Sequence, residues 1–173
     1  RAARAGARCA RIPGRTSTMI SLELGDEHRL LEHTVRDWAA REIAPRIHDL
    51  DRAHHFDRTI LPQMASLGLL GMTVPPEYGG AGMDYISLGL ASEELEYVDT
   101  SLRVILSVHT ALSGLTLLTW GTEDQKRRYL APQAQGVKIG GYGLTEPGAG
   151  SDARAIQSTA VRRGDRWVLT GEK

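Results

Sequence analysis

Apolar positions recur every three to four residues through much of the first 136 residues, which is the spacing of helices that bury one face. Residues 26–49 predict a surface helix that is kinked or ends near Pro45, because proline lacks an amide hydrogen and clashes with the preceding turn. Residues 57–68 predict a second helix, with Asp57 as its N-cap and Gly68 as its stop.

A stretch rich in glycine and proline then interrupts the helical pattern. Residues 71–84 contain the pair Pro75–Pro76 and the glycines Gly79, Gly80 and Gly82, which cannot sustain a helix or a central strand, so they predict a long loop. Helical spacing returns over residues 85–99. The helix that follows can be capped by Asp99, Thr100 or Ser101.

Residues 104–120 contain no acid, lysine or arginine, which could suggest a membrane span. Serine, threonine and His109 interrupt the segment, and it is shorter than the roughly 20 apolar residues that a span needs. A helix buried at the centre of a bundle is therefore the better interpretation, with His109 as a core histidine rather than a ligand. Thr122 and Gln125 then form a capping-box pattern that starts a helix ended by Gly136.

The period changes after Gly136. Residues 153–163 and 165–173 alternate apolar and polar positions, which predicts two strands joined by a hairpin loop at Arg163-Gly164-Asp165. That tripeptide also spells the integrin-ligand motif, but the chain shows no secretory features, so the hairpin is favoured. The predicted fold class is α+β, with a helical domain at 19–136 followed by the start of an antiparallel β domain at 137–173.

The charge is unevenly distributed along the chain, although the formal net charge of the 173 residues is zero. Residues 1–18 contain five arginines and no acid, which leaves 16 Lys and Arg against 21 Asp and Glu in the body. A mildly acidic body without a basic stripe argues against a nucleic-acid partner. The leader has the composition of a mitochondrial transit peptide, or it is a disordered or non-native tail that precedes a true start at Met19. Cys9 lies in this leader, so disulfides, cysteine metal sites and thiol catalysis are excluded for the body.

The stretch GYGLTEPGAGSDA, residues 141–153, is the main candidate site. Its glycines let backbone amides approach a ligand closely, Thr145 and Ser151 add hydroxyl donors, and Pro147 fixes a turn. Such a run is either a solvated turn or a nest for an anionic group. It is neither a Walker A loop nor the glycine fingerprint of a dinucleotide-binding fold.

YGLTEPGAGSD resembles the flavin-binding motif of the acyl-CoA dehydrogenase family. Further stretches resemble family motifs in the same order: VPPEYGGAGMD, GTEDQKRRYLAPQAQG and GDRWVLTGEK. The resemblance covers residues 19–173 and implies that the strands begin an antiparallel β-barrel domain. It also implies an FAD site in which Leu144 and Thr145 face the flavin ring and Ser151 also meets the substrate. The implied cofactor-binding residues are Tyr142, Gly143, Leu144, Thr145, Glu146, Pro147, Gly148, Ala149, Gly150 and Ser151.

The resemblance implies α,β-dehydrogenation of an acyl-CoA thioester, electron transfer to an electron-transferring flavoprotein, and a homo-oligomer. In the family, a second flavin contact and the catalytic glutamate follow the position of Lys173, so this chain is expected to be an N-terminal fragment that lacks the catalytic base and binds FAD weakly alone. Glu146 is not the base in the family, and its place in a tight turn suits hydrogen bonds to nearby backbone. A relative with different chemistry, such as nitroalkane oxidation, and a non-catalytic helical module are the alternatives.

The stretch ELEYVDTSLR resembles the glutaryl-CoA dehydrogenase branch of the family. There, a glutamate and an arginine at the positions of Glu96 and Arg103 receive the distal carboxylate of the substrate. A plain surface ion pair is the alternative. No metal site is expected, and the expected location is the bacterial cytoplasm, or the mitochondrial matrix if the leader is a transit peptide.

Overall fold

The computed structural model describes residues 23–173, so the predictions for the leader and Cys9 lie outside the described residues. The helices are α1 Asp26–Trp38, α2 Ile47–Arg52, α3 Ile60–Ser66, α4 Tyr85–Val98, α5 Thr100–Ser107, α6 Leu115–Trp120, α7 Glu123–Gln125 and α8 Ala131–Ala134. Wider π-helical turns lie at η1 Ala39–Ile43, η4 Val108–Gly114 and η5 Lys126–Leu130, and 3-10 turns lie at η2 Leu69–Gly71, η3 Pro76–Tyr78 and η6 Ala153–Ala155. The strands are β1 Thr159–Arg163 and β2 Arg166–Thr170.

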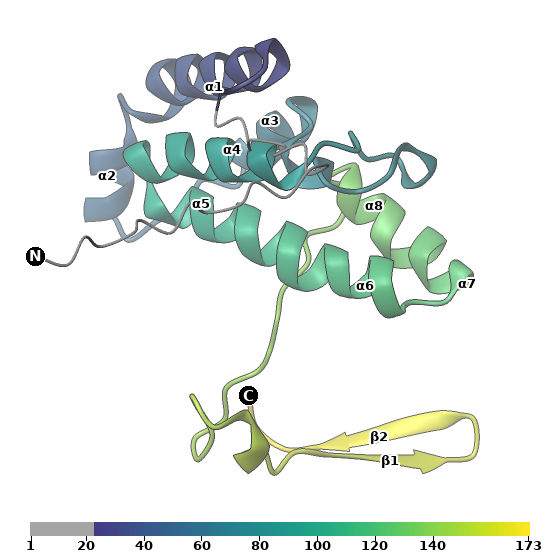
Figure 1. Cartoon of the computed structure of the whole chain (residues 1–173). Coiled ribbons are helices and arrows are strands. Elements are labelled where there is room, and N and C mark those ends of the chain that lie inside the picture. The colour runs from purple at the N-terminus through teal and green to yellow at the C-terminus, as the bar shows by residue number, and fades with distance from the viewer. Residues whose placement is uncertain (1–22) are drawn as a thin grey trace, which may run out of the picture.

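The helices form a packed layer, with α4 against both α1 and α5 (Figure 1). Val35, Leu95 and Leu102 from these three helices are fully buried in one core, which also takes side chains from α3 and η2. A second, smaller core joins Tyr78 of the glycine- and proline-rich loop to Leu130 of η5. Burial of these faces drives the packing of helices that are individually too short to be stable in water.

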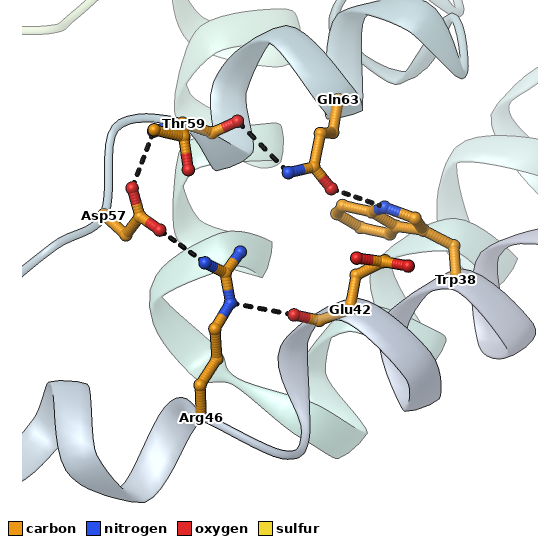
Figure 2. A network of polar contacts seen from close by, with 6 residues as sticks. All are labelled: Trp38, Glu42, Arg46, Asp57, Thr59 and Gln63. Carbon is orange, nitrogen blue, oxygen red and sulfur yellow. Dashed lines mark hydrogen bonds and ion pairs between the residues drawn. The ribbon is translucent and has the colours of Figure 1, made fainter.

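A polar network ties the first helical stretch to α3 (Figure 2). The Arg46 guanidinium donates to the Glu42 carbonyl at 2.8 Å and to the Asp57 carboxylate at 2.5 Å. At the other end of the same helical stretch, the Trp38 indole N–H donates to the Gln63 side-chain oxygen at a distance of 3.1 Å. The helix ends at Ile43 and resumes at Ile47, so the predicted break near Pro45 is confirmed. The network fixes the chain direction on both sides of that break.

Most of the predicted helix ends are confirmed. Asp99 caps α5 by accepting from the Ser101 amide, and Thr122 and Gln125 form both hydrogen bonds of a capping box. Gly136 adopts a left-handed φ of 71° just after α8, as a helix stop does. The prediction for Asp57 is wrong in register, because α3 begins at Ile60 and Asp57 instead accepts from the Thr59 amide one turn earlier.

The prediction that the apolar helix lies at the centre of the bundle is wrong. Helices α5, η4 and α6 form one continuous helix, Thr100–Trp120, which in length and composition could cross a membrane. Only 28% of its most apolar window is buried, so it lies at the side of the described bundle and not at the centre. Leu102, Leu106 and His109 line its buried face, whereas Leu112 and Trp120 are exposed. The absence of charged residues indicated an apolar helix, but it could not indicate how much of that helix the other described residues bury.

The two strands form an antiparallel hairpin set apart from the helices and reached by a single extended stretch of chain (Figure 1). Thr159 pairs with Thr170 and Arg163 with Arg166, and Gly164 has the positive φ that a two-residue turn requires. All ten strand residues are exposed. The prediction of a strand from residue 153 is wrong, since Asp152 caps the 3-10 turn η6 there and β1 starts at Thr159.

Candidate functional site

The glycine-rich segment connects the helices to the hairpin. Residues 141–145 are exposed, with Tyr142 at 53% and Leu144 at 39% of full accessibility. Among the described residues, no protein atom accepts a hydrogen bond from the five amides of 141–145 or from the Thr145 hydroxyl. This segment therefore presents a row of unused donors to whatever covers it.

The second part of the segment folds into a tight turn. The Glu146 amide donates to the Ala149 carbonyl at 2.9 Å, and the Ala149 amide donates back to the Glu146 carbonyl at 3.1 Å. Pro147 and Gly148 form the tip, and Ala149 is buried. Ser151 follows the turn with its side chain exposed.

The Glu146 side chain holds this turn against the base of the hairpin. Its carboxylate accepts from the Gln157 amide at 2.7 Å and the Ser158 amide at 3.1 Å, and it forms an ion pair with Lys173 at 2.9 Å. The neighbouring Ser158, the Gln157 amide and the Lys173 ammonium lower the pKa of Glu146 to about 2. The expectation that Glu146 bonds nearby backbone is confirmed. A carboxylate with three donors and so low a pKa is poorly suited to remove a proton.

Three of the four glycines in residues 141–151 face open space. A Cβ atom on Gly141, Gly148 or Gly150 would meet no atom of the described residues within 4 Å. Packing among these residues therefore does not require glycine at the three positions. Unused amides beside uncrowded glycines fit the close approach of a flat, hydrogen-bond-accepting ring such as a flavin.

The start of the segment is anchored to the helical layer by a histidine. The Gly140 amide donates to Nδ1 of His109 at 2.9 Å, and Nε2 of the same ring lies 3.1 Å from the Gln133 carbonyl in α8. His109 is 1% exposed, and burial lowers the pKa of its ring. The prediction of a core histidine is confirmed, although its link to Gly140 has no local signature in the sequence.

Glu96 and Arg103 meet across a helix break. Asp99 is extended and separates α4 from α5, yet Nε of Arg103 lies 2.6 Å from the Glu96 carboxylate. The Thr100 hydroxyl donates to the other oxygen of Glu96 at 3.0 Å. Arg103, followed by Thr100, lowers the pKa of Glu96. Within residues 23–173, no hydrogen bond or ion pair joins this pair to the segment 142–151.

Sequence reasoning missed three parts of this site. Lys173 donates to the Leu144 carbonyl at 2.9 Å as well as pairing with Glu146, so it bridges both halves of the segment. Gln157 and Ser158 contribute only backbone amides, which any residue type could supply.

In the described part of the chain, no three His, Cys, Asp or Glu side chains cluster as metal ligands would.

The profile of the acyl-CoA dehydrogenase N-terminal domain matches residues 25–137 of the sequence. The chain belongs to the acyl-CoA dehydrogenase family. The mouse short-chain specific acyl-CoA dehydrogenase, described as mitochondrial, is 43% identical over 153 residues, which are 88% of this chain and 37% of that relative. The chain therefore spans well under half the length of that acyl-CoA dehydrogenase.

Solved structures agree with the family and with the fold. Butyryl-CoA dehydrogenase from Megasphaera elsdenii superposes with a TM-score of 0.84 at 32% identity, over 88% of this chain and 41% of that chain. A glutaryl-CoA dehydrogenase from Mycobacterium smegmatis in complex with FADH2 gives 0.82 at 34% identity, over 86% and 38%. The predicted order of a helical domain followed by antiparallel strands is confirmed.

Proposed function

We propose that this chain supplies one half of the flavin and substrate site of an enzyme that dehydrogenates an acyl-CoA thioester between its α and β carbons. The row of unused donors at 141–145, held between Gly140 and Glu146, carries the proposal. Similarity to dehydrogenases named for short-chain, butyryl and glutaryl substrates supports an acyl-CoA substrate.

The cofactor that we propose is FAD, since one similar structure is a complex with FADH2. The segment Tyr142–Ser151 would hold it, with Leu144 and Thr145 against the ring and Ser151 shared with the substrate. Bound flavin supplies a two-electron acceptor for a hydride. The amides of 141–145 and the Thr145 hydroxyl are fixed donors, which stabilise negative charge that develops beside them.

We assign removal of the α-proton to a carboxylate outside this chain. Glu146 is excluded because its oxygens already accept from two amides and pair with Lys173. Transfer of electrons to an electron-transferring flavoprotein, assembly as a homo-oligomer, and location in a cytoplasm or a mitochondrial matrix stay predictions that rest on the family resemblance.

The full-length protein tests this proposal. We expect the apoprotein to take up FAD in a one-to-one ratio and to oxidise butyryl-CoA with an artificial electron acceptor. A panel of acyl-CoA thioesters that includes glutaryl-CoA gives the chain-length preference. Failure to bind FAD, or binding without oxidation of any thioester, would contradict the proposal.

A second candidate function is the oxidation and decarboxylation of glutaryl-CoA. The observation that favours it is the geometry of Arg103, which uses only Nε in its bond to Glu96. Among the described residues, nothing accepts from its two terminal nitrogens. Such a fork suits two parallel hydrogen bonds to a carboxylate.

A further inference from the structure

His109 is a buried titratable group that the proposed function does not use. It lies in η4, the π-helical turn between α5 and α6, where the widened helix carries the imidazole toward α8 and the chain beyond it. Turns of this kind are frequent at functional sites. Both ring nitrogens have a partner, Gly140 on Nδ1 and the Gln133 carbonyl beside Nε2.

The hydrogen bonds fix the state of the ring. A backbone amide can only donate, so Nδ1 of His109 carries no hydrogen and Nε2 carries the hydrogen that is donated to Gln133. The imidazole is therefore neutral, with one specified tautomer. Its Nδ1 lone pair is the acceptor for the Gly140 amide, the last amide before the unused donors of 141–145.

The approach of Gly140 to the helices is unusually close. The Ser113 hydroxyl donates to the Gln133 side-chain oxygen at 2.9 Å beside it. A Cβ atom on Gly140 would lie 2.3 Å from Oγ of Ser113 and 2.5 Å from Oε1 of Gln133. Any larger residue would push this stretch away from His109, so glycine here permits the bond.

Two anchors thus bound the five donor residues. His109 holds the amide that precedes them, and Glu146 holds the turn that follows them. With both ends fixed, the positions of the intervening amides are restricted before any ligand arrives. Preorganised donors bind a ligand more tightly because less ordering entropy is lost on binding.

We propose that His109 is a positioning residue for the cofactor, which acts by accepting the Gly140 amide and so placing the donors of 141–145 for FAD. This inference rests on the proposed function, since it requires the segment to bind FAD. His109 does not itself reach the segment's unused donors. Its contribution is mechanical and passes through one hydrogen bond.

Matched variants of the full-length protein separate the two bonds of the ring. His109→Asn keeps an acceptor near the position of Nδ1 and loses the bond to Gln133. His109→Gln keeps a donor near the position of Nε2 and loses the bond to Gly140, and His109→Leu loses both. Ser92→Ala is the control, because it removes a similar hydrogen bond, from Oγ to the Leu88 carbonyl at 2.7 Å, within α4.

The measurements are the FAD dissociation constant, from fluorescence titration of the apoprotein, and the melting temperature without FAD. We expect FAD to bind roughly three- to tenfold more weakly to His109→Gln and His109→Leu, the loss that one net hydrogen bond produces. His109→Asn and Ser92→Ala should stay within about twofold of the wild type, because both keep the bond to Gly140. The melting temperatures of the Asn and Gln variants should fall by similar amounts.

Two results would overturn the inference. One is wild-type FAD affinity in His109→Gln, and in His109→Leu if that variant folds. The other is equal weakening in His109→Asn and His109→Gln, which would assign the histidine a general packing role. If the wild-type protein itself does not bind FAD, the proposed function fails and the inference falls with it, a result distinct from both.

Discussion

Arg36 of α1 clamps Glu94 of α4 through two hydrogen bonds, Nε to one carboxylate oxygen at 2.9 Å and Nη2 to the other at 2.6 Å. The Glu94 side chain is 10% exposed, and Glu32 adds a second acceptor for the same guanidinium. Glu94, followed by Glu32, raises the pKa of Arg36. The charge pair thus joins two helices that also pack through the buried core.

Removal of one partner should destabilise the protein more than removal of both. Arg36→Met leaves the Glu94 carboxylate buried without its counter-ion, whereas Arg36→Met with Glu94→Leu replaces the pair by apolar contacts. We expect the single variant to have the lower urea midpoint. If the double variant unfolds at a lower urea concentration than Arg36→Met, the unpaired Glu94 carboxylate does not destabilise the protein and this argument is wrong.

The same substitution at two glycines should have opposite effects. Gly136 has φ +71°, and a Cβ atom there would lie 2.4 Å from Cβ of Ala65, so Gly136→Ala should cost roughly 1–3 kcal/mol. Gly89 lies within α4 with no atom within 4 Å of its added Cβ, so Gly89→Ala should gain about 0.5–1 kcal/mol. Denaturant unfolding of both variants measures the two signs, and a stabilising Gly136→Ala would contradict the packing at the end of α8.

The local patterns of the sequence were sufficient for most of the helices and their ends, but not for the N-cap of α3. Proline, glycine and capping residues act within one turn, so Pro45 and Gly136 could be assigned from sequence and the cap of α5 could be narrowed to residues 99–101. The coverage of the helix 104–120 depends on partners distant in the sequence, and there the prediction of a central position was wrong. Strand β1 started late because a capped turn at Asp152 competed with the alternating pattern.

Contacts between segments distant in the sequence were the part of the site that could not be predicted. Gly140 and His109 are 31 residues apart, and neither type is diagnostic of the other. Glu146 was recognised as a bonding group inside its turn, but its partners depend on how the hairpin folds back. The Glu96–Arg103 pair was suggested by the family resemblance of its stretch, and it forms across the break between α4 and α5.

Glu146 should make the glycine-rich turn sensitive to acid. Its pKa is lowered from an ordinary 4.5 to about 2, so its stabilising effect is complete above about pH 4.5 and is lost as the pH falls through about 2. Carbon NMR of the labelled carboxyl should show titration near pH 2. Lys173→Ala should raise this pKa while leaving it below 4.5, because both backbone donors remain. A wild-type titration at the ordinary value would contradict the hydrogen bonds at this carboxylate.

Substitution of Arg103 should separate the two candidate substrates. If its terminal nitrogens receive the distal carboxylate of glutaryl-CoA, Arg103→Gln should lower kcat/KM for glutaryl-CoA by roughly ten- to hundredfold, the loss that accompanies a hydrogen bond to a charged group. Butyryl-CoA lacks that carboxylate, so its turnover should change little. Arg127→Gln is the matched control, since Arg127 forms an exposed ion pair with Glu123 at 2.7 Å within one helical stretch and should affect neither substrate.

The decisive quantity in that experiment is the ratio of kcat/KM for glutaryl-CoA to kcat/KM for butyryl-CoA. If the ion pair only stabilises the junction of α4 and α5, its loss in Arg103→Gln should lower both activities together or neither, because the fold is common to both reactions. Glu96→Gln sharpens the test, since it removes a negative charge beside Arg103 and keeps a side chain of similar size. For a carboxylate-binding arginine, this variant should lower KM for glutaryl-CoA and leave butyryl-CoA unchanged. An equal effect on both thioesters would reduce Glu96 and Arg103 to a structural pair.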